Sequence, residues 1–316
     1  MEVKRAVSKE YYEGCLLGSA IGDTLGAPVE GLDKKSIQNY HGQVTDFLPC
    51  IYPSGSYTDD TQQTILVAES LVANKGILNP EDLAQRFVRY YDSNEYRAIG
   101  DTFRAAVERL KEGYSWKESG LQEPENGKLP LGCGSAMRVA PVGLLYNTKE
   151  ELLDNAVNSS LPTHAHPETL AGAAIVAYCV SYVKSRNSQD INFDHLLPEI
   201  QNIASRLKAE RMYKRLDLLR RNKFTADTLE QLGTTGDVMS SVTSALACFM
   251  LYPSNYEATV IEAVNLGGDT DSRAAMAGAI SGAYNGVNAI PTRWLHDLEN
   301  REGIRQLAEE LYELRR

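Results

Sequence analysis

The 316-residue chain lacks most features of a secreted, membrane-embedded or disulfide-stabilised protein. Its five cysteines are odd in number and form no CxxC pair, so we expect reduced thiols rather than a disulfide framework or a zinc site. No run approaches about 18 uninterrupted apolar residues, the length that a membrane-spanning helix needs. The first residues also lack the apolar stretch of a signal peptide. These absences predict a cytoplasmic protein with no membrane contact.

Positive charge is scarce relative to negative charge. The chain has 32 Lys and Arg against 42 Asp and Glu, a formal net charge of -10 at pH 7. A nucleic-acid-binding protein needs a basic face, so no nucleic-acid partner is expected. An anionic small ligand is still compatible with this balance, because backbone amides or a bound cation can make a local site positive.

Strand-like alternation is also scarce, and its best candidate, residues 44–48, is weak. Helical spacing recurs along the whole chain instead. It predicts helices over residues 11–21, 61–73, 81–91, 102–111, 167–183, 238–251, 256–264, 272–284 and 304–314. We interpret residues 1–316 as a single all-α domain. Two long irregular stretches, 23–57 and 113–133, are of the kind that often carries function.

Glycines recur at four-residue spacing near both ends of the chain, at positions 14, 18 and 22 and again at 278 and 282. Such small residues let helix backbones approach closely, so tight packing is the main interpretation of these glycines. The Ala-rich segment 167–183 is expected to be deeply buried.

Two acidic clusters each precede an apolar helical run. The first is YTDDTQ at residues 57–62, and the second is NLGGDTDS at residues 265–272. Acids in such places suit the positive end of a helix dipole, and Thr58, Asp59 or Asp271 could be N-caps. Capping accounts readily for one acid per helix and less well for two. It does not account for the paired glycines before Asp269.

A metal site is the alternative interpretation of the same acids. Four carboxylates meeting at one site would repel each other strongly unless cations lay among them. The clusters contain no His or Cys, and oxygen ligands favour magnesium or manganese, with calcium possible. The residues after Asp269 do not follow the EF-hand spacing, because the fifth position is Arg273. The residues alone leave capping and metal binding open.

Taken together and in order, these clusters and three further motifs resemble the ADP-ribosylglycohydrolase family. That family includes the enzyme that reactivates ADP-ribosylated dinitrogenase reductase, and also the J-type crystallins. The resemblance covers nearly the whole chain. Its motifs are GCLLGSAIGDTLGAPVE at residues 14–30, TDDT at 58–61, GCGSAMRVAP at 132–141, TH at 163–164 and GGDTDS at 267–272.

The resemblance implies an orthogonal helical bundle and assigns roles to the matching residues. Two divalent cations, Mg2+ or Mn2+, would be held by Thr58, Asp59, Asp60, Asp269, Asp271 and Ser272. Catalysis would rest on Asp59, Asp60 and Glu30, the last of these at the mouth of the site. The ADP-ribose cleft would be lined by Gly100, Gly132, Cys133, Gly134, Ser135, Met137, Arg138, His164, Gly236 and Gly268.

The implied reaction is hydrolysis of the glycosidic bond between ADP-ribose and an acceptor, either a protein or a small conjugate. We expect ADP-ribosyl-arginine as the substrate, because the motifs look closer to the dinitrogenase-reductase-activating branch than to the serine-specific branch. The alternatives are hydrolysis of serine- or O-acetyl-linked ADP-ribose, a nucleotide phosphohydrolase, and a non-catalytic crystallin-like relative. The sequence does not fix the oligomeric state, and a monomer is plausible.

Some positions depart from the family pattern. Cys133 stands where Asn is common, and Asp237 stands where an aromatic residue is frequent. Some arginine-specific members carry a catalytic Asp near the position of Ala98, whereas here the nearest one is Asp101. These changes bear on the substrate linkage more than on the fold.

Two kinds of residue have competing interpretations. His164 and His166 could form a metal pair, although a His near a buried helix start is more often a hydrogen-bonded structural residue. Arg138 could clamp a phosphate or pair with one of the acids. The sequence contains no GxSxG, HExxH, P-loop or dinucleotide-binding motif.

Overall fold

The computed structural model describes residues 7–122, 129–186, 191–221, 229 and 231–315. Throughout these residues the regular structure is helical, with two isolated bridges and no strand, so the predicted all-α class is confirmed. None of the described helices combines the length and apolarity that a bilayer crossing needs. Part of the predicted loop 113–133 and the first six residues of the chain lie outside the described residues.

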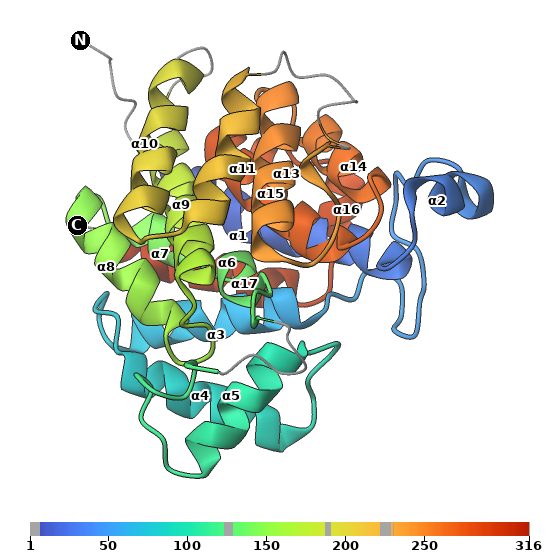
Figure 1. The fold of residues 1–316 in the computed structure, drawn as a ribbon. Coiled ribbons are helices and arrows are strands. Elements are labelled where there is room, and N and C mark those ends of the chain that lie inside the picture. The colour runs from blue at the N-terminus through green and yellow to red at the C-terminus, as the bar shows by residue number, and fades with distance from the viewer. Residues whose placement is uncertain (1–6, 123–128, 187–190, 222–228, 230, 316) are drawn as a thin grey trace.

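The helices follow one another along the chain, and a long connection joins residue 41 to residue 59 (Figure 1). Their bounds are α1 Lys9–Gly26, η1 Ala27–Val29, α2 Lys34–His41, α3 Asp59–Ala73, α4 Pro80–Ser93, α5 Asp101–Lys111, α6 Gly134–Met137, α7 Ala140–Leu145, α8 Lys149–Ser160, α9 Pro167–Val183, α10 Phe193–Arg206, α11 Glu210–Arg221, α13 Val238–Leu251, α14 Tyr256–Asn265, α15 Thr270–Asn285, η2 Val287–Ala289, α16 Thr292–Asp297 and α17 Arg301–Glu313.

All nine predicted helices are present, and α9 and α13 have the predicted bounds. The stretch 23–57 was predicted to be irregular, and this is wrong in part, because α1 continues to Gly26 and η1 and α2 follow. Asp33 is the N-cap of helix α2, and its side chain accepts a hydrogen bond from the Ser36 amide. It buries only Ile37, so it has no apolar period to detect.

The strand candidate at residues 44–48 is also wrong. The Asn265 side chain satisfies both backbone groups of Val44: its Oδ1 accepts from the Val44 amide, and its Nδ2 donates to the Val44 carbonyl. A side-chain amide from α14 therefore takes the place of a neighbouring strand.

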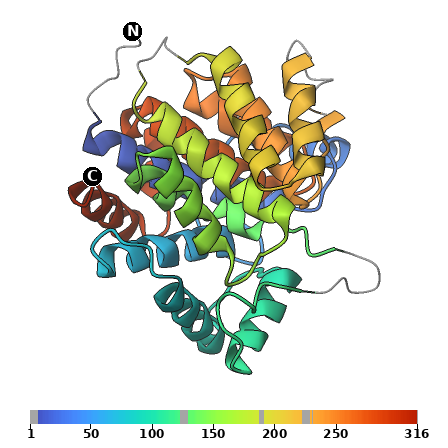
Figure 2. The same cartoon turned by 60° about the vertical axis from the view of Figure 1, so that its left-hand side comes forward.

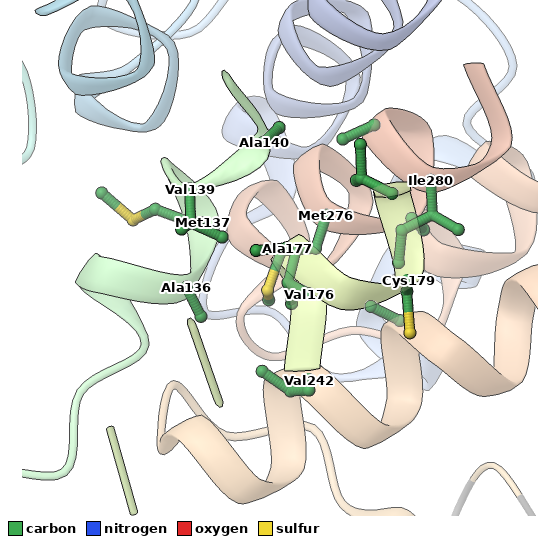
Figure 3. Close-up of a cluster of buried hydrophobic side chains, with 14 of the residues drawn as sticks. Ala136, Met137, Val139, Ala140, Val176, Ala177, Cys179, Val242, Met276 and Ile280 are labelled. Carbon is green, nitrogen blue, oxygen red and sulfur yellow. The ribbon is translucent and has the colours of Figure 1, made fainter. Parts of the chain in front are cut away.

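The core lies where α9 meets α6, α7, α13 and α15 (Figure 3). Helix α9 is buried along nearly its whole length, as its Ala-rich sequence predicted. Small and branched side chains fill this region, among them Ala136, Val176, Val242 and Ile280. The core thus holds α6 against α9 and α15.

Helices α1 and α15 touch backbone to backbone in the centre of the molecule (Figures 1 and 2). A Cβ atom added to Gly22 would lie 2.0 Å from the Ala274 carbonyl oxygen, and one added to Gly282 would lie 1.9 Å from the Gly14 oxygen. The predicted tight packing of the glycines is therefore confirmed. This contact brings the C-terminal end of α1 beside the N-terminal end of α15.

Below this pair, α3 packs against α1 and α17, and α4 and α5 form an outer layer on α3 (Figure 1). Helix α2 projects from the right-hand side of the molecule in this view. Helix α3 also contacts α15, and its first residue, Asp59, lines the same cavity as Asp101 at the start of α5.

Candidate functional site

The two acidic clusters meet, although more than 200 residues separate them in the chain. The first begins α3 and the second begins α15. The Ser272 hydroxyl donates to Asp60 Oδ2 over 3.3 Å, which joins the clusters directly. Close contact between α1 and α15 makes this possible: a Cβ on Gly26 would lie 2.5 Å from the Asp271 Cα.

Capping explains only one of these residues. Thr58 is the N-cap of α3, and its hydroxyl accepts from the Asp60 amide. Asp269 occupies the N-cap position of α15 but its side chain makes no capping hydrogen bond. Asp59, Asp60 and Asp271 lie inside the first turns, so capping leaves the gathering of acids unexplained.

Asp23 holds the first acidic cluster in place, although no role was predicted for it. Its side chain is fully buried and accepts four hydrogen bonds, from the amides and the hydroxyls of Thr58 and Thr61. Asp23 therefore anchors the turn that carries Asp59 and Asp60. Its one sequence signal is an acid near the end of an otherwise apolar helix.

Burial and mutual repulsion raise the pKa values of the clustered carboxylates. Burial, followed by repulsion from Asp271 and Asp23, raises the pKa of Asp60 well above its ordinary value. Burial and the charges of neighbouring acids also raise the pKa values of Asp59 and Asp271. In the described part of the chain, no hydrogen-bond donor meets the buried Asp60 Oδ1.

This chemistry fits divalent cations. An orphaned, buried carboxylate oxygen among like charges needs a positive partner, and hard cations prefer oxygen ligands. Carboxylate oxygens of Glu30, Asp269 and Asp271 also lie within 4.8 Å of one another. Glu30 thus joins the acidic group that could hold a metal, whereas the sequence placed it outside that group.

Backbone hydrogen bonds to Gly268, in the second acidic cluster, hold the residues that follow Glu30. The Gly31 amide donates to the Gly268 carbonyl over 2.8 Å, and the Gly268 amide donates to the Leu32 carbonyl over 2.7 Å. Burial, then the charges of Asp269 and Asp23, raise the pKa of Glu30. The two backbone hydrogen bonds therefore place the carboxyl group of Glu30 beside Asp269.

The acids line a cavity of about 330 Å³. The predicted residues that line it are Glu30, Asp59, Asp60, Gly100, Gly132, Cys133, Gly134, Met137, His164, Gly236, Asp269, Asp271 and Ser272. Four other predicted residues do not line the cavity, namely Thr58, Ser135, Arg138 and Gly268. The lining residues that the sequence analysis did not name as site residues are Gln63, Ala98, Asp101, Thr102 and Phe103.

The glycine loop, residues 132–134 at the start of α6, packs against His164. A Cβ on Gly134 would lie 2.8 Å from His164 Cε1, so a side chain there would displace the imidazole. Beside the loop, the Cys133 thiol lies 3.4 Å from Asp269 Oδ2, and the Ser241 hydroxyl donates to the same oxygen. Cys133 and Ser241 therefore orient Asp269 from the side of the loop.

Asp237 and the two histidines have local structural roles. Asp237 is the N-cap of α13, where it accepts from the Ser240 amide. His166 caps α9 by accepting from the Glu168 amide, whereas the Nδ1 of His164 contacts the Thr163 hydroxyl. The two histidines thus make separate local contacts, and they do not form the metal pair that was considered.

Comparisons with known proteins find relatives that match nearly the whole chain. The family model described as ADP-ribosylglycohydrolase matches residues 5–316. The ADP-ribosylhydrolase ARH3 of Bos taurus is 30% identical, over 97% of this chain and 93% of that protein. The ADP-ribosylarginine hydrolase Tri1 of Serratia proteamaculans is 29% identical, over 98% of this chain and 81% of its own length. A solved structure titled "ADP-ribosylglycohydrolase-related protein complex" superposes with a TM-score of 0.77 at 29% identity, over 97% of this chain and 98% of its own.

Proposed function

Because the chain belongs to the ADP-ribosylglycohydrolase family, we propose that it uses divalent cations to cleave the glycosidic bond between ADP-ribose and an acceptor. One observation supports this proposal most: two distant acidic turns and a glycine loop line the same cavity. The acidic end suits cations and the ribose, and the amides of the loop suit a diphosphate. We also propose that residues 1–316 form one domain and act in the cytoplasm, where the five free cysteines stay reduced.

The residues that would hold the cations are Asp59, Asp60, Asp269 and Asp271, with the hydroxyls of Thr58 and Ser272. When bound, Mg2+ or Mn2+ would supply positive charge that fixes the ribose hydroxyls and polarises oxygen ligands. The chain's own residues then manage the proton. Hydrolysis adds water to the anomeric carbon and returns one proton to the leaving acceptor. Glu30, at the rim of the cavity, is placed to hold that proton.

We expect Glu30→Gln to lower kcat at least about 100-fold, the usual range for loss of a general acid or base. The amide keeps the shape of the side chain but cannot transfer the proton. Binding of free ADP-ribose, measured by calorimetry with Mg2+ present, should change only a few-fold. Glu112→Gln, on an exposed residue at the end of α5, is the matched control. Near-normal turnover by the Glu30 variant would remove Glu30 from the mechanism.

Removal of divalent metal is expected to abolish hydrolysis and to lower the melting temperature. A ligand that binds only the native state stabilises it by about 2.7 kcal/mol at 100 times its Kd. Chelation followed by gel filtration, with activity and thermal unfolding measured before and after metal is restored, tests this expectation. Full activity in the stripped protein would contradict metal dependence.

For the acceptor, we propose arginine. Glu30, Asp101 and the acidic turns give the cavity a negative lining, which suits a cationic guanidinium leaving group better than a neutral serine hydroxyl. Rates on arginine-, serine- and O-acetyl-linked ADP-ribose, with and without Mg2+ or Mn2+, test the choice. We expect the arginine substrate to be fastest, and Asp101→Asn to slow it more than the serine substrate. A faster serine rate would overturn the arginine assignment and direct attention to Ala98 in the same wall.

The remaining alternatives differ in their products. Free ADP-ribose indicates glycosidic cleavage, whereas AMP would indicate a diphosphate hydrolase. A non-catalytic relative could lose its metal ligands without penalty, yet all six implied ligand residues are present here. Their presence favours the enzyme.

A further inference from the structure

Arg138 is not among the residues that line the cavity, and neither of its hydrogen bonds goes to a carboxylate, although its positive charge acts on nearby Asp59. Its side chain is 1% exposed, and its guanidinium packs on the rings of Phe87 and Phe103, with the Cζ atom 4.3 and 5.9 Å from their centroids. Its two hydrogen bonds go to neutral side chains, Gln63 and Thr163. A buried cation with neutral partners costs stability, which a packing residue of similar size would avoid.

One arm of the guanidinium leads to the acidic end of the cavity. Nη1 donates to Gln63 Oε1 over 2.5 Å, and Gln63 Nε2 donates to Asp59 Oδ2 over 2.6 Å. A guanidinium can only donate, so it fixes which end of the Gln63 amide faces it. The amide nitrogen must then point to Asp59. Arg138 therefore orients the Asp59 carboxylate through one intermediate side chain.

The other arm leads to His164. Nη2 donates to Thr163 Oγ1 over 2.6 Å and occupies one lone pair of that oxygen. The adjacent positive charge makes the hydroxyl a better donor and a poorer acceptor. Its proton has two possible acceptors: the Ser160 carbonyl at 3.5 Å and His164 Nδ1 at 2.7 Å. Only the second has the length of a good hydrogen bond.

If Nδ1 accepts, a neutral imidazole must carry its proton on Nε2. Burial, helped by the charge of Arg138, lowers the pKa of His164 to about 3, so the ring is neutral at physiological pH. His164 is 2% exposed and lines the cavity, and within the described residues no hydrogen bond to Nε2 occurs. The Nε2 edge lies beside the glycine loop, 3.0 Å from where a Cβ of Gly134 would be.

We propose that Arg138 is a positioning residue for both ends of the cavity. Through Thr163 it fixes His164 as the tautomer with its proton on Nε2, available to an acceptor oxygen of the ligand. Through Gln63 it orients the Asp59 carboxylate. The role of Nε2 toward ADP-ribose rests on the proposed function, whereas the tautomer and the orientation of Asp59 do not.

Imidazole nitrogen NMR on the full-length, metal-free protein tests the Thr163 arm. The chain has five histidines, and a His164→Gln spectrum identifies the His164 signals by difference. We expect a proton on Nε2 and a bare Nδ1 in the wild type. Thr163→Val removes the donor and should populate both tautomers, whereas Thr163→Ser keeps the hydroxyl and should preserve the wild-type spectrum. Thr259→Val, at a buried threonine whose hydroxyl meets only carbonyl groups, is the matched control.

Titration with free Mn2+, followed by electron paramagnetic resonance, tests the Gln63 arm. Gln63→Met should weaken Mn2+ binding about 10-fold, the usual cost of losing a partner of a ligand, and should leave the tautomer unchanged. Thr163→Val should leave Mn2+ binding unchanged and weaken ADP-ribose binding about 5-fold, the worth of one hydrogen bond. Arg138→Met should change both the His164 tautomer and Mn2+ binding. If this variant does not fold, Thr163→Val and Gln63→Met still test the two contacts separately.

Several results would overturn the proposal: a wild-type proton on Nδ1, an unchanged spectrum in Thr163→Val, or unchanged Mn2+ binding in Gln63→Met. Failure of the wild type to bind ADP-ribose would instead count against the proposed function. The tautomer would still be decided by the spectra.

Discussion

Replacing Asp60 by Asn is expected to lower the hydrolytic rate at least about 100-fold, because loss of even an outer partner of a metal ligand costs about 10–100-fold. Among the clustered acids, Asp60 is the one that we most expect to bind a cation. It is 3% exposed, it faces four other carboxylates, and its Oδ1 meets no hydrogen-bond donor within the described residues. Asn preserves the shape and removes the charge that a cation needs.

The same substitution should raise the melting temperature of the metal-free protein. A carboxyl whose pKa is higher in the folded chain than in the unfolded chain stabilises the fold only while it is protonated. That contribution is lost as the pH rises through the folded-state pKa. The metal-free wild type should therefore lose stability as the pH rises above the ordinary carboxyl range, and Asp60→Asn should reduce this loss.

Thermal unfolding with and without Mg2+, at several pH values, gives the stability result, and steady-state kinetics gives the rate. Asp154→Asn, on an exposed residue of α8, removes the same charge away from the cavity and should change neither. If Asp60→Asn unfolds the protein while its folded fraction turns over normally, the acid has a structural role and the metal site is elsewhere.

Gly22→Ala is expected to destabilise the protein by at least about 3 kcal/mol, at the upper end of the cost of overpacking a core. The added methyl would meet the Ala274 backbone at 2.0 Å. Both contact surfaces are helix backbone, so neither can move aside without separating α1 from α15. On an exposed helix the same substitution would instead stabilise by about 0.5–1 kcal/mol, so the expected sign is opposite.

Urea unfolding of both variants measures the difference. Gly100→Ala is the control for stability, because a Cβ there would meet nothing within 4 Å and the backbone φ is -70°. We expect its effect to be within about 0.5 kcal/mol of zero. A Gly22→Ala protein as stable as the wild type would show that the helices can separate slightly without cost.

The helices that sequence reasoning located best are those with a continuous apolar or Ala-rich content. Helices α9 and α13 have that content, and their bounds were predicted without error. Helix α10 was missed although Leu196, Ile200 and Ile203 have helical spacing, because Pro198 interrupts the pattern. Helix α2 offered no pattern at all, since it lies against the molecule through Ile37 alone.

At the site, charge and motif order were enough to predict that the two acidic turns form one site. The residues that orient them were not predictable. Asp23 contacts Thr58 and Gln63 contacts Arg138, both far away in the chain, and nothing in their local sequence marks those contacts. Arg138 was recognised as important, yet its two proposed roles were both direct ones. Its actual partners, Gln63 and Thr163, are neutral residues that sequence reasoning does not single out.

The pairing of α1 with α15 has a consequence for how the chain is made. Helix α1 is synthesised first and α15 among the last, so the glycine face of α1 stays uncovered until about 280 residues have left the ribosome. Closing so large a loop is slow compared with pairing neighbouring helices. The residues proposed to hold the cations lie at positions 58–60 and 269–272, so they come together only after α15 has been made. Tight cation binding would then report that α1 and α15 have paired.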